Sequence, residues 1–300
     1  MLSTVSTILM SLVGVSFLYV LYRTVKGQPI ERRVVFLYIA LAISLPLLMQ
    51  KSAPVPVTPD VQQLVDALDK LPPGAKVLAA FDYDPASAPE LQPMGVAFFK
   101  YAFKHDFKVI IMGLWPQGPQ QANQAIIEAM QDPEIAAKNL QVGEDYVNLG
   151  FQSGNEFVIQ SMGSGFKRMF PTDDRRIPYD DIPLLNDITD FSNIDFIFNL
   201  SAGKPGTVEW VQIAVDRFGA KCGAGNTAVQ APQVYPYLRS GQLIGLLGGM
   251  SGGAEFEKAV NEKGQASTFI FAQMISHATV IAFIIIGNMA FFISRKKKKA

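Results

Sequence analysis

Two acidic side chains and one serine have the residue types and spacing that are best suited to chemistry. Asp82 and Asp84 form a D-x-D motif directly after the apolar run at 76–81, and Ser251 is the serine of a G-x-S-x-G motif. A carboxylate can act as a nucleophile or as a general acid or base, and a serine in a sharp strand-to-helix turn can act as a nucleophile. These three residues are therefore the candidate catalytic residues.

The glycine-rich segment around Ser251 has three interpretations. A serine nucleophile needs a base, and the only histidines are His105, in an earlier helical segment, and His277, inside an apolar run. A glycine-rich loop that enters a helix can instead bind an anion through its amide groups and the helix dipole, which would use Gly249, Ser251 and Gly252. The third interpretation is a tight turn that binds nothing.

The segment that ends in Asp82 and Asp84 resembles the opening motif of haloacid dehalogenase-like phosphatases. This resemblance implies that Asp82 is the nucleophile and Asp84 the general acid. The apolar run ending in Ser201 is similar to the second motif of that family, with Lys204 or Lys221 as its lysine. The sequence departs from the family because no Asp pair follows a late strand, so magnesium lacks ligands. The alternative is that Asp82 caps a turn or helix that begins at Asp84.

Apolar runs that alternate with helical segments predict the fold that positions these residues. Strands are predicted at 76–81, 107–114, 145–150, 195–200, 220–224 and 243–247, and helices at 58–71, 89–105, 119–140, 156–162, 207–218 and 254–263. Short, continuously apolar strands separated by helices are typical of a parallel sheet covered on both faces. We therefore predict an α/β fold with a single doubly wound, Rossmann-like, mainly parallel sheet.

Such sheets bind ligands at the carboxyl ends of their strands, where this sequence has small polar residues. The candidate ligand-binding residues are Asp82, Asp84, Ser153, Asn155, Ser201, Lys204, Asn226, Thr227, Gly249, Ser251 and Gly252. Turns that bind nothing use the same residue types. No P-loop is present and no G-x-G-x-x-G follows a predicted strand, so no cofactor is assigned. Because the chain has two histidines and one cysteine, Cys222, no metal site is predicted.

The composition predicts a membrane protein. Hydrophobic residues make up 49% of the chain and charged residues 17%. The apolar runs at 5–22, 34–49 and 269–293 predict three transmembrane helices, since a helix needs about 20 apolar residues to cross a bilayer. No charge precedes the first run, which argues against a signal peptide.

Basic residues predict the orientation of these helices. They occur between the first two runs, as Arg23, Lys26, Arg32 and Arg33, and in the tail at 295–299. Lysine and arginine concentrate on the cytoplasmic side, and three spans place both clusters there. We expect a prokaryotic plasma membrane, with the N-terminus outside and the C-terminus cytoplasmic. The tail is either a membrane anchor or a retrieval signal.

The predicted domains follow from these assignments. They are a transmembrane hairpin at 1–50, a proline-rich spacer at 51–59, an extracytoplasmic α/β domain at 60–268, a transmembrane helix at 269–294 and a basic tail at 295–300. The formal net charge is zero, which excludes a global basic field for nucleic acid.

The predicted function is non-enzymatic: a ligand-binding or scaffolding subunit of a membrane assembly. Its expected partners are the lipid bilayer, other membrane proteins in a homo- or hetero-oligomer, and a small anionic ligand. Asn288 in the third run is suited to bonding another helix. The alternative is a phosphatase-like or hydrolase-like enzyme that acts on an anionic small molecule at the strand ends.

Overall fold

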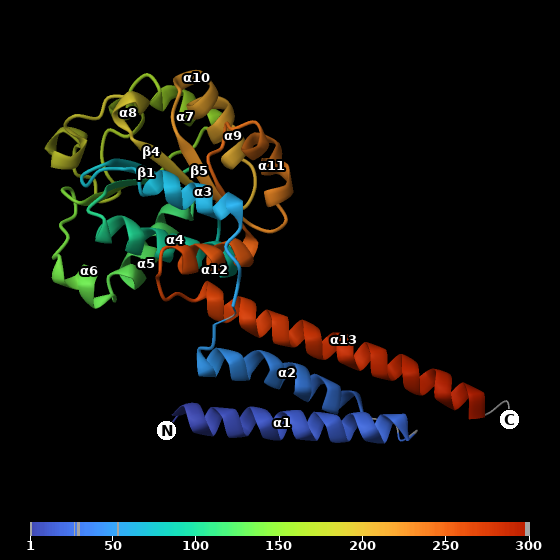
Figure 1. Cartoon of the computed structure of the whole chain (residues 1–300). Coiled ribbons are helices and arrows are strands. Elements are labelled where there is room, and N and C mark those ends of the chain that lie inside the picture. The colour runs from blue at the N-terminus through green and yellow to red at the C-terminus, as the bar shows by residue number, and fades with distance from the viewer. Residues whose placement is uncertain (1, 27, 29–30, 53, 298–300) are drawn as a thin grey trace. The chain divides into compact units, whose positions relative to one another are not determined.

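The chain divides into two compact units, shown with their elements in Figure 1. One unit is Val55–Ala266, and the other combines Met1–Pro54 with Ser267–Ala300. The computed structural model describes residues 2–26, 28, 31–52 and 54–297, and it describes only the backbone of residues 2–10, 25, 293, 294, 296 and 297.

Six parallel strands form one sheet in the unit Val55–Ala266. They are β1 (Lys76–Asp82), β2 (Lys108–Gly113), β3 (Tyr146–Phe151), β4 (Phe196–Ser201), β5 (Cys222–Asn226) and β6 (Leu246–Gly248). Their order in the sheet is β3-β2-β1-β4-β5-β6. The order reverses direction between β1 and β4, and this is the position where doubly wound sheets of this order bind ligands. The predicted α/β fold with a parallel sheet is confirmed.

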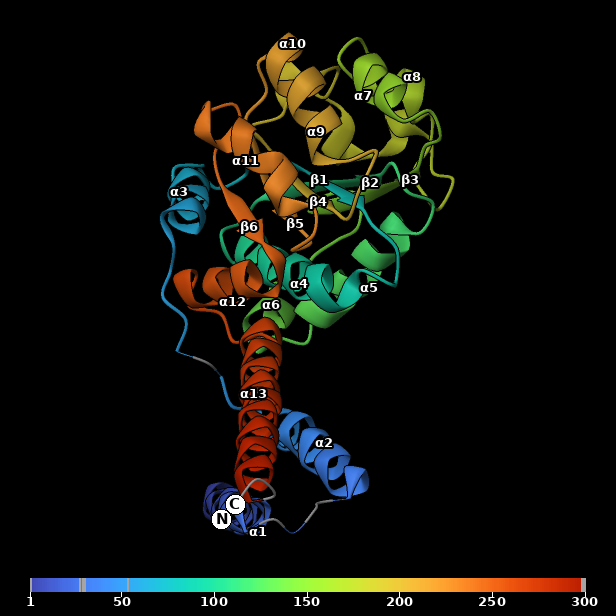
Figure 2. The same cartoon turned by 90° about the vertical axis from the view of Figure 1, so that its right-hand side faces the viewer.

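Helices cover both faces of this sheet, as Figure 2 shows. The first face packs against α3 (Pro59–Leu68), α4 (Ala88–Lys104), α5 (Gly118–Ala129), α6 (Pro133–Ala137) and α12 (Gly249–Ala259). The second face packs against α7 (Glu156–Met162), α8 (Phe166–Met169), α9 (Thr207–Trp210), the π-helical turn η4 (Val211–Val215), α10 (Asp216–Phe218) and α11 (Ala231–Arg239). Three 3-10 helices, η1 (Tyr179–Asp181), η2 (Pro183–Leu185) and η3 (Phe191–Asn193), lie between α8 and β4.

The strands are mostly apolar because both of their faces are buried. In β1, Leu78 and Ala80 belong to the hydrophobic cluster on the second face, while Val77, Ala79 and Phe81 belong to the cluster on the first face. Successive side chains of a strand point to opposite faces, so neither set has access to water. This double burial explains why the strands are recognisable as continuous apolar runs.

Several helices differ from the sequence prediction; for example, the helix predicted at 119–140 is divided into α5 and α6. Helix α12 begins at Gly249 rather than at residue 254, so the glycine-rich segment lies inside the helix. A β-carbon at Gly252 would lie 2.6 Å from the carbonyl carbon of Leu247, and glycine therefore permits this helix to pack closely on β6. Helix α11 was not predicted, because Pro236 lies inside it and proline usually ends a helix.

The second unit consists of α1 (Leu2–Val25), α2 (Arg32–Met49) and α13 (Ala266–Lys297). Two segments of the described chain are long and apolar enough to cross a membrane: Arg32–Met49, with mean hydropathy 1.8, and Ala266–Phe292, with mean hydropathy 2.2. The described apolar part of α1 is the shorter segment Ser11–Thr24.

Two of the three predicted spans are therefore supported by the described residues, because Ser11–Thr24 is shorter than the minimum of about 17 residues for a span. The side chains of 5–10, which belong to the predicted first span, lie outside the described residues. The part of the predicted basic tail at 298–300 also lies outside them.

Candidate functional site

The candidate site lies where β1 and β4 end, at the reversal of strand order. Asp82 is the last residue of β1 and pairs in register with Ser201, the last residue of β4. In dinucleotide-binding sheets the turn after β1 is rich in glycine, which brings the backbone close to the phosphates. Here that turn contains Tyr83, Asp84 and Pro85 and no glycine. The carboxyl ends of β1 and β4 lie side by side as predicted, but the turn after β1 lacks the glycines of a nucleotide-binding turn.

Asp82 is the centre of a buried hydrogen-bond network. Its side chain is 0% exposed. Oδ1 accepts a hydrogen bond of 2.7 Å from the backbone N–H of Leu114, and Oδ2 accepts bonds of 2.7 Å from Asn199 Nδ2 and 2.8 Å from Trp210 Nε1. Burial raises the pKa of Asp82 to about 7, although the three donors oppose this shift. The carboxyl group thus ties together the loop after β2, strand β4 and helix α9.

The same network continues from β4 to β5. Thr207 Oγ1 donates to Asn199 Oδ1 at 2.6 Å and accepts from Asn226 Nδ2 at 2.8 Å. Asn226 Nδ2 also lies 3.3 Å from the carbonyl oxygen of Ser201. Within the described chain, Asn226 Oδ1 is a buried side-chain oxygen without a hydrogen-bond partner. Apart from this atom, these buried polar groups satisfy one another, as stable burial requires.

Trp115 links the loop after β2 to the loop after β4. This half-buried residue follows β2, and its Nε1 donates a 2.7 Å hydrogen bond to the carbonyl oxygen of Pro205, which follows β4. A β-carbon at Gly203 would lie 3.3 Å from Trp115 Cζ2, so the indole ring also packs against the loop after β4. Because β1 lies between β2 and β4, this contact crosses the carboxyl end of β1. The indole therefore lies among the loops at the carboxyl ends of β2 and β4, the two strands that flank β1.

Two carboxylates of the chain itself accept hydrogen bonds from backbone N–H groups that a bound anion would need. Glu209 Oε2 accepts a 2.8 Å hydrogen bond from the N–H of Gly206, and Glu209 Oε1 lies 3.4 Å from Lys204 Nζ. Glu90 Oε2 accepts a 2.8 Å hydrogen bond from the N–H of Ala228. Both amides are in loops that follow strands, where a bound phosphate or carboxylate would compete with these internal acceptors.

Ser251 lies apart from the Asp82 network. Its Oγ donates to Glu255 Oε1 at 3.2 Å, and Glu255 Oε2 accepts from the N–H of Thr58 at 2.9 Å and from its Oγ1 at 2.6 Å. Ser251 thus helps to join α12 to the start of α3. His105 follows the last residue of α4, beside the beginnings of β1 and β2, so it lies at the opposite edge of the sheet from the strand ends.

The remaining predicted residues are only partly brought together. Thr227 lies beside the network, because its N–H donates to the carbonyl oxygen of Ser201 at 3.4 Å. Asp84 Oδ1 accepts from the N–H of Ser87 at 3.3 Å and shapes the turn into α4. Ser153 and Asn155 are exposed in the loop after β3, two strands away from β1.

Gly249 belongs to the packing of α12 rather than to the network. Its φ of 59° is in the left-handed region, and a β-carbon there would lie 2.9 Å from that of Ala228. Glycine is therefore required at this position by backbone conformation and by space.

Sequence reasoning missed five polar or aromatic residues that build the site. They are Glu90, Trp115, Asn199, Glu209 and Trp210. One signal was present, because Asn199 interrupts the otherwise apolar run of β4. A polar residue in a strand that is buried on both faces needs a buried partner.

Cys222 lies in the core of the α/β unit, away from the polar network around Asp82. Cys222 is fully buried in β5, and burial raises the pKa of its thiol to about 12. Among the residues that the structure describes, no group of three or more His, Cys, Asp and Glu side chains is placed to hold a metal ion.

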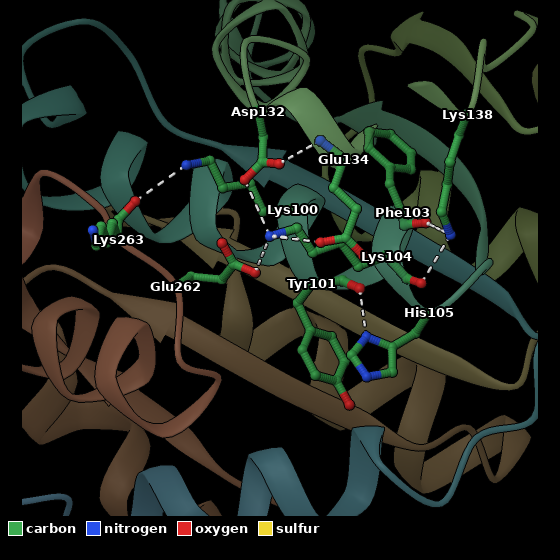
Figure 3. Close-up of polar contacts among 10 residues, drawn as sticks. All are labelled: Lys100, Tyr101, Phe103, Lys104, His105, Asp132, Glu134, Lys138, Glu262 and Lys263. Carbon is green, nitrogen blue, oxygen red and sulfur yellow. Dashed lines mark hydrogen bonds and ion pairs between the residues drawn. The ribbon is translucent and has the colours of Figure 1, made fainter. Parts of the chain in front are cut away.

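A second polar cluster lies at the opposite edge of the sheet (Figure 3). Lys104 Nζ lies 2.6 Å from Glu262 Oε1, 3.1 Å from Asp132 Oδ2 and 3.6 Å from Glu134 Oε2. Desolvation opposes the charge of Lys104, but its bonds to Glu262 and Asp132 raise its pKa. Lys138 Nζ donates to carbonyl oxygens in the last turn of α4. These ion pairs and hydrogen bonds stabilise the packing of α4 against α6 and against the segment after α12.

No protein-family model, curated protein or solved structure matches the chain. Its class is therefore defined by its own architecture: an α/β protein with six parallel strands, joined to helices that are long and apolar enough to enter a membrane.

Proposed function

We propose that the chain is a membrane-anchored, non-enzymatic scaffolding subunit that binds another protein through the strand ends of its α/β unit. The observation that supports this function is that Trp115 bonds to Pro205 across the strand ends while Asp82 is fully buried. A small-molecule site needs polar groups that converge on open space. Here the polar groups at the strand ends bind one another instead of pointing into open space. The loops are therefore better suited to contact the surface of another protein than to hold a small molecule.

The exposed side chains beside the strand ends favour a protein as the partner. Phe157, in the helix that follows β3, is 67% exposed, and Val229, in the loop that follows β5, is 85% exposed. Aromatic and apolar side chains of this kind are enriched in protein interfaces, from which charged residues are depleted. The unit Val55–Ala266 has 16 Lys and Arg residues against 25 Asp and Glu residues, and this acidic balance also disfavours nucleic acid, which needs basic groups.

The membrane location is part of the same proposal. Helices α2 and α13 have the required length and apolarity. We include α1 as a third span, because its helix continues over 24 residues. Three spans place the basic residues between α1 and α2 on the same side as Arg295, and the positive-inside rule then puts Val55–Ala266 outside the cell.

A photoreactive amino acid placed at two exposed apolar positions tests this function. Phe157 lies beside the strand ends, while Ile127, which is 58% exposed on α5, serves as the matched control. Irradiation of native membranes should join a second protein to the chain from position 157 and leave position 127 unreacted. Equal yields from both positions, or no product from position 157, would contradict the proposal.

The elevated pKa of Asp82, about 7, favours a second candidate: an enzyme acting on an anionic small molecule. A carboxyl group with such a pKa is suited to general acid or base catalysis. Asp82 is fully buried, so substrate would reach it only if the loops around it moved, and the Trp115–Pro205 bond joins two of these loops. A phosphate-ester panel assayed with the wild type and with Trp115→Ala tests this candidate. Hydrolysis that rises in Trp115→Ala and is lost in Asp82→Asn would support the enzyme.

A further inference from the structure

The unit formed by α1, α2 and α13 contains a cavity of about 200 Å³. All three helices line it, with Gly14 and Phe17 from α1, Tyr38 and Ala42 from α2, and Thr279 from α13 among the lining residues. None of its lining residues carries a charge. The cavity therefore has the chemistry of a site for an apolar molecule.

We propose that this cavity binds one acyl chain of a membrane phospholipid. The inference rests on the membrane location proposed above. An apolar cavity of this kind stays dry and accepts apolar ligands. In a bilayer the apolar molecules that surround the helices are lipid chains, which can enter the cavity from the side.

The hydroxyl groups in the cavity wall are already bonded to the protein. Tyr38 Oη donates to Ser16 Oγ at 2.8 Å, and Thr279 Oγ1 donates to the carbonyl oxygen of Ile275 at 2.8 Å. A polar ligand would have to break these bonds, whereas a hydrocarbon chain needs none. The satisfied hydroxyl groups thus select for an acyl chain over a headgroup.

The cavity is a defined recess rather than ordinary lipid-facing surface. Tyr38 is 8% exposed and Ala42 is 9% exposed, whereas Leu37, on the same helix, is 57% exposed. The rings of Phe17 and Phe283 make an edge contact with centroids 5.1 Å apart, and Phe17 meets Tyr38 at 5.5 Å. These aromatic contacts hold the three helices together on one side of the recess.

Gly14 marks the open part of the recess. A β-carbon built on Gly14 would meet no atom within 4 Å, so a larger side chain there would extend into the cavity without a clash. Gly287 on α13 has the same open surroundings but does not line the cavity. The pair Gly14→Leu and Gly287→Leu therefore separates filling of the cavity from the general effect of replacing a glycine in a lipid-facing helix.

The test uses the full-length chain in phosphatidylcholine vesicles whose acyl chains carry a photoreactive diazirine. After irradiation, mass spectrometry measures labelling of the α2 peptide at Ala42 and at Leu37. We expect labelling at Ala42 to exceed labelling at Leu37 several-fold. We also expect Gly14→Leu to lower labelling at Ala42 at least fivefold and Gly287→Leu to leave it unchanged.

Three results would overturn the proposal: equal labelling at Ala42 and Leu37, an equal loss in both glycine variants, or replacement of the lipid adduct at Ala42 by a protein adduct. The variant Thr279→Val, which keeps the side-chain shape, should retain labelling because the Thr279 hydroxyl is bonded to its own helix. If the chain does not insert into the vesicles, the proposed membrane location is wrong. Entry with uniform labelling refutes the acyl-chain site alone.

Discussion

Replacement of Asp82 by asparagine should remove part of the pH dependence of stability. Desolvation raises the pKa of Asp82 in the folded protein from 3.8 to about 7. The stabilising contribution of this group is therefore fully present below its unfolded pKa and is lost as the pH rises through about 7. The amide side chain of the Asp82→Asn variant cannot ionise, so the variant should lack this loss of stability at high pH.

The size of the effect follows from the shift in pKa. Each pKa unit corresponds to about 1.4 kcal/mol, so a shift of about three units corresponds to about 4 kcal/mol in total. Part of this change occurs below pH 5, where only the unfolded chain titrates. Between about pH 5 and pH 8 the free energy of unfolding should fall by about 2.5 kcal/mol more in the wild type than in Asp82→Asn.

Tryptophan fluorescence during urea unfolding measures this difference in the full-length chain in mild detergent. The chain has two tryptophans. Both of them, Trp115 and Trp210, are in the α/β unit, so the signal reports on that unit. Asp84→Asn is the matched control for the substitution itself, because Asp84 is partly exposed in the turn after β1 and lies outside the buried hydrogen-bond network. Parallel pH curves for the wild type and Asp82→Asn would refute the buried-carboxyl argument.

Three further outcomes are expected. Gly252→Ala should lower the free energy of unfolding, measured with urea, by about 2 to 3 kcal/mol, because the added β-carbon overlaps the backbone of β6. Gly165→Ala is its control: a β-carbon at Gly165 meets no atom within 4 Å, so the free energy of unfolding should change little. Cys222 should react with iodoacetamide at pH 8 at least about 100-fold more slowly in the native chain than in urea, because the buried thiol is rarely ionised; equal rates would show that β5 is accessible. Glu90→Gln should cost about 1 kcal/mol by weakening a bond to a backbone amide, and no change would show that this bond is not formed.

The strands were predictable because their burial is continuous. The run predicted at 76–81 corresponds to β1 (Lys76–Asp82), and the run predicted at 195–200 corresponds to β4 (Phe196–Ser201). A strand covered on both faces has few polar positions to interrupt its pattern, and Asn199 in β4 is one of them. The spatial order of the strands is not contained in any local pattern, since it depends on which connections cross from one face of the sheet to the other.

The state of Asp82 could not be predicted from its local motif. The D-x-D sequence suggested catalytic or ligand-binding acids, but the donors that enclose Asp82 come from distant positions: Leu114 is 32 residues away and Trp210 is 128 residues away. The glycines around Ser251 suggested a loop for a similar reason. Their role depends on the backbone of Leu247 and on neighbouring helices, which only the folded chain brings close.

A cryo-electron microscopy structure of the full-length chain, extracted from its native membrane with mild detergent, distinguishes a scaffold from an enzyme. We expect a second protein in contact with Phe157 and Val229, with the indole of Trp115 still bonded to the loop after β4. A small molecule bound between the ends of β1 and β4, with Trp115 displaced and Asp82 in contact with that molecule, would contradict the proposed function.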